Sequence, residues 1–362
     1  MSNPVDIMIV GTGAFAARIL FDLVATADVA TRVAVAGRNE QRLAWLGTAA
    51  RARVHMYRRP VTIETCVAQP SEHDEICSLL SRMKPAVVLQ AASLQAGSVI
   101  AAQRNAWSKL VAAGGLSASA VIQSMLSARV ARACAETVPE ARLINACFPD
   151  VVNTIIAALG LKVTCGIGNI QILAHCFGGT LAPSDARDLK LLSHYKNLGA
   201  WRLQPSERSG ANARVWLDDK EIGDVFERFH AVQLTPEPVI DISGAAAAPL
   251  MLALAHRRAW RGHVPGPEGL PGGYPVRVDD GRLQLDLPSG LTRAAAVHWN
   301  SAHEAAGGLV VNGDGSVRYA GRLHEELYAV SPSIAAGFHV RDLDANFAAM
   351  QNLRERLLAI PG

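Results

Sequence analysis

Six residues near the start of the chain, Gly11-Thr-Gly13-Ala-Phe-Ala16, constrain the fold more than any other feature. They have the form G-x-G-x-x-A, they follow an apolar run at 6–10, and apolar residues three and four apart come after them. Between a strand and a helix, the first glycine makes a tight turn and the second lets the backbone approach a pyrophosphate. The pattern predicts a dinucleotide-binding turn at Gly11, Thr12, Gly13, Phe15 and Ala16. A glycine turn without a ligand is the alternative.

Strands and helices are expected to alternate through the first half of the chain. Apolar runs of strand length recur at 33–36, 61–67, 86–90 and 142–147, and segments with helical periodicity separate them. This order is typical of a parallel sheet with helices on both faces. We expect an α/β protein with a doubly wound Rossmann domain over residues 1–150. An α+β substrate and dimerisation domain is expected over residues 151–362.

The second half has a different pattern. We expect strands at 170–176, 215–217, 276–278, 283–287 and 308–311. A tightly packed helix is expected from Gly244, and an amphipathic helix at 342–360. Short strands mixed with helices in this way indicate an α+β arrangement.

Composition excludes several classes of protein. The 362 residues are 50% hydrophobic, which provides a large core, and a formal charge of +3 is too balanced for a nucleic-acid binder. The longest apolar stretches, near 86–102 and 151–163, are interrupted by polar residues and glycine, so we expect no membrane span. The first residues run into a strand without a signal peptide, and six scattered cysteines form no Cys-x-x-Cys pair. We therefore expect a cytoplasmic protein with reduced thiols.

The end of the second predicted strand indicates which cofactor binds. An NAD site usually has a carboxylate there, whereas this chain has Gly37-Arg38-Asn39. A guanidinium pairs with a 2′-phosphate through two hydrogen bonds, so Arg38 and Asn39 favour NADPH. A surface arginine at a helix start is the alternative, since 29 of the 35 basic residues are arginine. Ala92 and Ser93 follow the fourth strand, where a nicotinamide ribose would approach, and strand–helix packing explains them equally well.

Hydride transfer to a carbonyl or imine needs a proton donor, and three residues are candidates. His175 precedes two glycines and is the first candidate, although a core histidine is the alternative. Asp150 is placed to orient a histidine or to bind a substrate amine, and capping the next helix is its alternative. Lys196 lies in Ser193-His-Tyr-Lys-Asn197, whose histidine and tyrosine are further donors, and a solvated loop is the alternative.

Metal ligation is not expected from these patterns. His303 and Glu304 offer polar groups, but the chain has no His-Glu-x-x-His motif and no paired cysteines. We therefore predict no metal site.

Residues 6–95 resemble the NADP-binding half of saccharopine dehydrogenase-like oxidoreductases. The resemblance lies in the Gly11–Ala16 turn, in Ala36-Gly-Arg-Asn39, and in Ala86-Val-Val-Leu-Gln-Ala-Ala92. It implies an NADP-dependent oxidoreductase with a substrate derived from an amino acid.

A second resemblance begins at residue 139. Residues 139–150, a helix and Gly166-Ile-Gly168 are similar in order to lactate and malate dehydrogenases. Phe148 stands where that family has an asparagine that contacts the substrate, and the family's Leu-Asp pair is absent after Gly168. The family's Asp–His relay therefore does not carry over. Opine dehydrogenases are similar in architecture alone.

Together these features predict an NADPH-dependent reductase that transfers a hydride to a small carbonyl or imine substrate. We expect it to act as a homodimer, as such enzymes commonly do. Two alternatives stay open. One is an NADP-binding regulatory protein, and the other is a lyase or isomerase that oxidises its substrate transiently.

Overall fold

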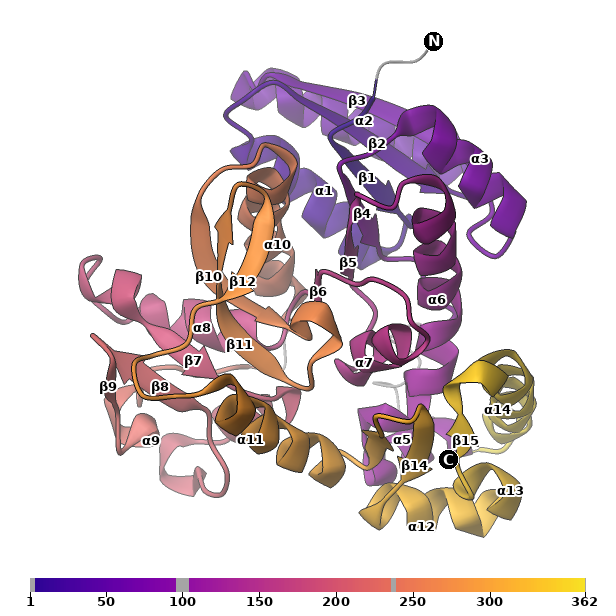
Figure 1. The fold of residues 1–362 in the computed structure, drawn as a ribbon, viewed down its shortest axis with the longest axis vertical. Coiled ribbons are helices and arrows are strands. Elements are labelled where there is room, and N and C mark those ends of the chain that lie inside the picture. Colours follow the sequence, from indigo (N-terminus) through magenta and orange to yellow (C-terminus); the bar gives the residue numbers. More distant parts are fainter. Residues whose placement is uncertain (1–3, 96–103, 236–238, 362) are drawn as a thin grey trace.

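Six parallel strands form the central sheet, in the order β3-β2-β1-β4-β5-β6 (Figure 1). This is the order of a doubly wound dinucleotide-binding sheet. The computed structural model describes residues 4–95, 104–235 and 239–361. The six strands are β1 (Ile7–Val10), β2 (Thr31–Gly37), β3 (Val61–Val67), β4 (Val87–Gln90), β5 (Arg142–Asn145) and β6 (Cys165–Gly166).

Helices cover both faces of this sheet, because alternate residues of its strands point to opposite sides. Ile7 and Ile9 of β1 lie in one core with α1 and α2, while Met8 and Val10 lie in another with α3, α6 and α7. The predicted α/β Rossmann fold is therefore confirmed. The helices are α1 (Ala14–Thr26), α2 (Glu40–Tyr57), α3 (His73–Met83), α5 (Ala106–Gly114), α6 (Ala120–Thr137) and α7 (Val151–Ala158).

A helix from the second half of the chain also covers the sheet. This helix, α10 (Ile240–Ala255), packs against α1, and its fully buried Ala247 lies in the same core as Ile7 (Figure 1). The two helices approach closely, since a Cβ on Gly244 would lie 2.3 Å from Cγ of Arg18. The predicted boundary between two domains at residue 150 stays a prediction. Two elements that follow this residue, β6 and α10, belong to the sheet and to the helices that cover it.

Small antiparallel sheets and helices make up the rest of the described chain, so the predicted α+β character is confirmed. The sheets have the orders β7-β8-β9, β10-β11-β12 and β13-β14-β15. Their strands are β7 (Lys190–Leu192), β8 (Arg214–Leu217), β9 (Lys220–Glu221), β10 (Trp260–Pro265), β11 (Gly273–Asp279), β12 (Arg282–Leu285), β13 (Leu309–Val311), β14 (Ser316–Tyr319) and β15 (Phe338–His339). The helices are α8 (Ile170–Gly178), α9 (Val225–Arg228), α11 (Arg293–Ala306), α12 (Gly321–Val330), α13 (Pro332–Ala335) and α14 (Leu343–Leu358).

The strand predicted at 170–176 is wrong, because these residues form α8. Ile170, Leu173 and Phe177 are buried at helical spacing, but Ile172 and Ala174 are buried as well. A short segment that is apolar on all sides has no periodicity that separates a helix from a strand. The other predicted strands of the second half and both of its predicted helices are present.

No helix within the described ranges has both the length and the hydrophobicity needed to cross a membrane. The six cysteines are all free.

Candidate active site

The glycine-rich turn joins β1 to α1 and contacts the end of β4. Gly11 has φ +133°, and a Cβ there would lie 2.7 Å from the carbonyl carbon of Ala91 and from the nitrogen of Ala92. Only glycine fits this close approach. A Cβ on Gly13 would meet no atom within 4 Å, so the outer side of the turn is open. Gly13 is the N-cap of α1, and the first turn of this helix has no acidic side chain. The free backbone N–H groups at the start of the helix can therefore bind an anion.

Two arginines lie beside this turn. A Cβ on Gly37, at the end of β2, would lie 2.6 Å from Cγ2 of Thr12, so the exposed Arg38 follows directly after a contact with the turn. Nε of Arg42 donates a hydrogen bond to the carbonyl of Thr12 at 3.1 Å. Asn39 caps α2, because its Oδ1 accepts a hydrogen bond of 2.8 Å from the backbone N–H of Arg42.

Phe15 and Ala16, also predicted at the cofactor, lie in the first turns of α1. Ala16 is buried in the core that β1 shares with α1 and α2, and the half-buried Phe15 packs against that core. The small side chain of Ala16 therefore does what the pattern requires of it, which is to let α1 pack closely on the sheet.

Ala92 and Ser93 connect the end of β4 to its neighbours. Oγ of Ser93 lies 2.6 Å from Oε1 of Gln123 in α6 and donates a hydrogen bond to it. The carbonyl of Ala92 accepts the amide of Gln90 at 2.8 Å and the thiol of Cys147 at 3.3 Å. These bonds hold the carboxyl ends of β4 and β5 together, as the packing interpretation requires.

A buried group of polar side chains lies beyond the ends of β5 and β6. We call Asp150, Asn169, His194, Tyr195 and Glu304 the Asp150 cluster. They come from the start of α7, the start of α8, the segment after β7, and α11. Asp150, His194 and Glu304 have exposed fractions of 4%, 1% and 5%. Three titratable groups buried at the carboxyl edge of a doubly wound sheet indicate a functional site.

Asp150 bonds to Asn169 instead of capping its helix. It occupies the N-cap position of α7, but its side chain makes no capping bond. Its Oδ1 accepts a short hydrogen bond from Nδ2 of Asn169. Asn169 has φ +39°, and a positive φ costs energy in a residue other than glycine. A strained residue that holds a buried carboxyl group is typical of functional sites.

His194 is held at both ring nitrogens. Nδ1 accepts the backbone N–H of Lys196 at 3.3 Å, and Nε2 lies 3.3 Å from Oε2 of Glu304. Because Nδ1 accepts, Nε2 carries a hydrogen and donates it to the carboxylate. The ring of Tyr195 lies 4.4 Å from that of His194, and its hydroxyl lies 3.2 Å from the hydroxyl of Ser117. His194 therefore positions Glu304, and both of its nitrogens already have partners.

Several polar atoms in this region are buried without a hydrogen-bond partner among the described residues, and three of them belong to the Asp150 cluster or its neighbour His303. These three are Oδ2 of Asp150, Oε1 of Glu304 and Nε2 of His303. Such orphaned atoms are rare in folded proteins and indicate where a ligand or water binds. Burial, and after it the nearby Glu304, raise the pKa of Asp150 to about 7, although His194 and the hydrogen bond from Asn169 act to lower it. Near neutral pH this carboxyl group is therefore poised to give or take a proton.

The structure brings some of the predicted catalytic residues together but not others. Asp150 and His194 lie in one cluster. His175 is exposed on the last turn of α8, outside the cluster. Lys196 is exposed too, and its Nζ donates to the carbonyl of Ala306 at 2.5 Å, at the end of α11.

Glu304 is the residue whose place in the site the sequence reasoning missed. The buried face of α11 consists of Ala296, Asn300 and Glu304, which are spaced four residues apart. This spacing places a carboxylate on the side of a helix that packs inward. That signal was present in the sequence, but the partner of Glu304 lies 110 residues earlier in the chain.

Solved structures with a similar fold include two malate dehydrogenases. The enzyme from Salinibacter ruber superposes with a TM-score of 0.52 and 14% identity, over 83% of this chain and 96% of that chain. The apo enzyme from Picrophilus torridus has a TM-score of 0.51 and 10% identity, over 98% of this chain and 99% of that chain. No protein-family model and no curated protein sequence matches the chain. Identities this low establish a shared fold and nothing about activity.

Proposed function

We propose that the protein is an NADPH-dependent oxidoreductase that transfers a hydride to the carbonyl or imine carbon of a small substrate. One observation carries the proposal. Asp150 is buried at the carboxyl edge of the sheet, with an unpartnered oxygen and a pKa raised to about 7. A group with these properties suits general acid catalysis at neutral pH. For the reaction class the proposal also takes, as an analogy of fold alone, the likeness to two malate dehydrogenases.

The residues of the glycine-rich turn fit a dinucleotide. The open side of Gly13 leaves room for a pyrophosphate at the start of α1, where backbone N–H groups point outward. Arg38 and Arg42 provide positive charge beside the turn for a 2′-phosphate, which favours NADPH. When bound, the cofactor supplies the hydride.

Asp150 supplies the proton in this proposal. As the substrate carbon accepts a hydride, Oδ2 of Asp150 gives its proton to the carbonyl oxygen or imine nitrogen. The resulting carboxylate keeps its hydrogen bond from Asn169, and His194 lies close enough to lower its pKa. Oε1 of Glu304 and Nε2 of His303 are left to hold polar groups of the substrate.

The charge of the cluster favours a substrate that carries an amine. While Asp150 holds the proton that it donates it is neutral, so the negative charge of the cluster is that of the Glu304 carboxylate, and no arginine of the described ranges forms an ion pair with either residue. Such a site repels a dicarboxylate and attracts an ammonium or iminium group. The resemblance of residues 6–95 to saccharopine dehydrogenase-like proteins supports the same class, an imine or ketone derived from an amino acid.

The test compares three single variants for NADPH oxidation against a panel of 2-oxo acids, with and without added amines. Asp150→Asn keeps the shape of the side chain but cannot donate the proton, so we expect turnover to fall by about a hundredfold or more. His175→Ala and Lys196→Met test the other two predicted donors, and both should keep turnover within about threefold.

NADPH affinity, measured by fluorescence, should be unchanged in all three variants. Full turnover in Asp150→Asn with loss in His175→Ala would move the proton donor to His175. Failure of the wild-type protein to bind either nicotinamide cofactor would refute the proposed function.

A homodimer in the cytoplasm is proposed as the working form. Light scattering on the purified full chain tests the assembly. A particle with the mass of one 38.4 kDa chain at micromolar concentration would contradict it.

A further inference from the structure

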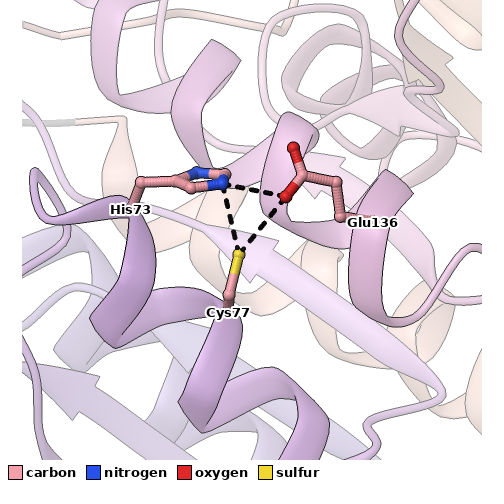
Figure 2. Close-up of side chains that lie close together, drawn as sticks. All are labelled: His73, Cys77 and Glu136. Atoms are coloured by element: carbon pink, nitrogen blue, oxygen red, sulfur yellow. Dashed lines mark hydrogen bonds and ion pairs between the residues drawn. The ribbon is translucent and has the colours of Figure 1, made fainter.

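A second cluster of chemically active side chains lies on the far side of the Rossmann sheet from α1. His73 and Cys77 lie on α3, and Glu136 lies near the end of α6. Nε2 of His73 is 2.9 Å from Oε2 of Glu136 and 3.4 Å from Sγ of Cys77, and Sγ is 3.8 Å from the same carboxylate oxygen (Figure 2). Three donor atoms of three different types therefore converge on one point, and none of them belongs to the proposed active site.

The local fold holds these donors in place. His73 and Cys77 are four residues apart and share one face of α3, while Ile76 and Leu80 on the same helix are buried in the core. α3 packs against α6, whose Cys134 lies in that core too. Each donor therefore extends from a helix that is anchored by buried neighbours.

The site is open to solvent. The side chains of His73 and Glu136 have exposed fractions of 40% and 57%, and Cys77 is half-buried. An ion can enter without unfolding, and water can occupy a further position. An exposed histidine–carboxylate pair alone would contribute little stability.

We propose that His73, Cys77 and Glu136 bind a zinc-class transition-metal ion, with water as the fourth ligand. The distances between the donors fit a tetrahedral ion. With Zn–S of about 2.3 Å and Zn–N and Zn–O of about 2.0 Å, tetrahedral ligand atoms lie about 3.3–3.6 Å apart. The observed separations of 2.9, 3.4 and 3.8 Å bracket that range. Small rotations of exposed side chains are enough to reach it.

The donor set selects the class of ion. A thiolate and an imidazole are soft or borderline ligands that suit zinc, cobalt and copper, whereas magnesium and calcium prefer oxygen. A cysteine binds such an ion as a thiolate, so the Cys77 thiol must lose its proton when the metal binds. Binding forms the metal–sulfur bond and releases that proton to solvent. Affinity is therefore expected to rise with pH.

The bound ion would join α3 to α6, which cover the same face of the sheet and are far apart in the sequence. We infer a structural role, because the cluster shares no residue with the Asp150 cluster. Loss of the ion should leave the proton-transfer groups in place.

The experiment uses the full-length, tag-free protein after removal of metals with a chelator. Cobalt(II) is titrated first, because a thiolate ligand gives a charge-transfer absorption band, and zinc(II) is then used to displace it. We expect one ion per chain, release of about one proton, and a higher melting temperature with zinc than without. Cys77→Ala should abolish the band, and His73→Ala and Glu136→Gln should each weaken zinc binding at least about tenfold.

Two variants serve as matched controls. Ser81→Ala removes a hydroxyl from an exposed residue of α3, and Cys176→Ala removes a half-buried thiol on α8. Both should bind zinc as the wild type does, and circular dichroism confirms that every variant is folded. Absence of saturable binding, or an unchanged cobalt band in Cys77→Ala, would overturn the proposal. If zinc affinity fell as far in the two control variants as in the ligand variants, the proposal would be overturned as well.

Discussion

Asp150 is a buried carboxyl group whose proton is held more tightly in the folded chain than in the unfolded one. Its pKa is raised from an ordinary value of 3.8 to about 7, chiefly by burial. Between about pH 4 and pH 7 the folded state keeps a proton that the unfolded state has lost. The contribution of Asp150 to stability is therefore greatest in acid and decreases as the pH rises through this window.

Asp150→Asn removes this pH dependence, because an amide does not ionise. The melting temperature of the variant relative to the wild type should therefore increase from about pH 5 to about pH 8. The change should correspond to at least about 1 kcal/mol, since one pKa unit is worth about 1.4 kcal/mol. Thermal unfolding followed by circular dichroism in the two buffers measures it.

Asp280→Asn is the control, because the pKa of this carboxyl group is lowered and no change in stability is expected between the two buffers. Asp280 is exposed, and the Arg257 guanidinium that bonds to it lowers the pKa of its carboxyl group. Its removal should therefore cost the same stability at pH 5 as at pH 8, because a lowered pKa changes stability only at pH values below the ordinary value of 3.8. If the difference in melting temperature between Asp150→Asn and the wild type were the same in both buffers, the raised pKa of Asp150 would be contradicted.

Arg38 provides a prediction about cofactor choice. Arg38→Ala should weaken NADPH binding by about tenfold to a hundredfold, the value of a charge-assisted bond to a phosphate, and leave NADH binding unchanged. Arg51→Ala, which removes an exposed arginine further along α2, is the matched control and should bind both cofactors as the wild type does. Fluorescence titration with each cofactor measures the affinities. Equal losses for NADPH and NADH in Arg38→Ala would remove the argument for a 2′-phosphate.

At the scale of the element, the turn between β1 and α1 contains two glycines with different requirements. Gly11 needs both a positive φ and empty space, whereas Gly13 has φ −68° and open surroundings. The first glycine is therefore a requirement of folding, and the second is a requirement of ligand binding alone.

Substitution by alanine separates these two requirements. Gly11→Ala should destabilise the protein by more than about 2 kcal/mol, through strain and through contact with the backbone of Ala91. Gly13→Ala should leave stability within about 1 kcal/mol of the wild type but weaken cofactor binding at least about tenfold. Denaturant unfolding and fluorescence titration provide the two measurements. Unchanged cofactor affinity in Gly13→Ala would show that no ligand approaches the turn.

Elements of the Rossmann sheet could be predicted from sequence because each has its own periodic signal. The helical spacing of Ile76, Leu79 and Leu80 and the apolar run of β4 are local properties of the chain. α8 could not be assigned, since its short apolar sequence is buried on nearly all sides. The pairing of His194 with Glu304 could not be predicted either, because that contact depends on how α11 packs against the segment after β7.

At the scale of the whole molecule, α10 packs the second half of the sequence against the first, and we expect the two halves to unfold together. Its Ala247 is fully buried in the core that contains β1, while Ala245 on the same helix is exposed. A change inside this contact should therefore affect the entire fold.

Ala247→Asp places a carboxylate without a partner in that core, and we expect it to cost more than about 3 kcal/mol. Ala245→Asp makes the same chemical change on the exposed side and should cost less than about 0.5 kcal/mol. Calorimetry should show a single transition that moves to lower temperature in Ala247→Asp. Two separate transitions, with only one of them displaced, would instead support independent domains divided near residue 150.

The position of α10 also has a consequence for synthesis on the ribosome. More than 200 residues separate the end of α1 from the start of the helix that covers it. At about 5–20 residues per second, the nascent chain exposes the uncovered surface of α1 for about 10–40 seconds before α10 is made. During that interval we expect a chaperone that recognises apolar surface to bind the nascent chain. Slow translation near residue 240 would prolong its exposure to aggregation.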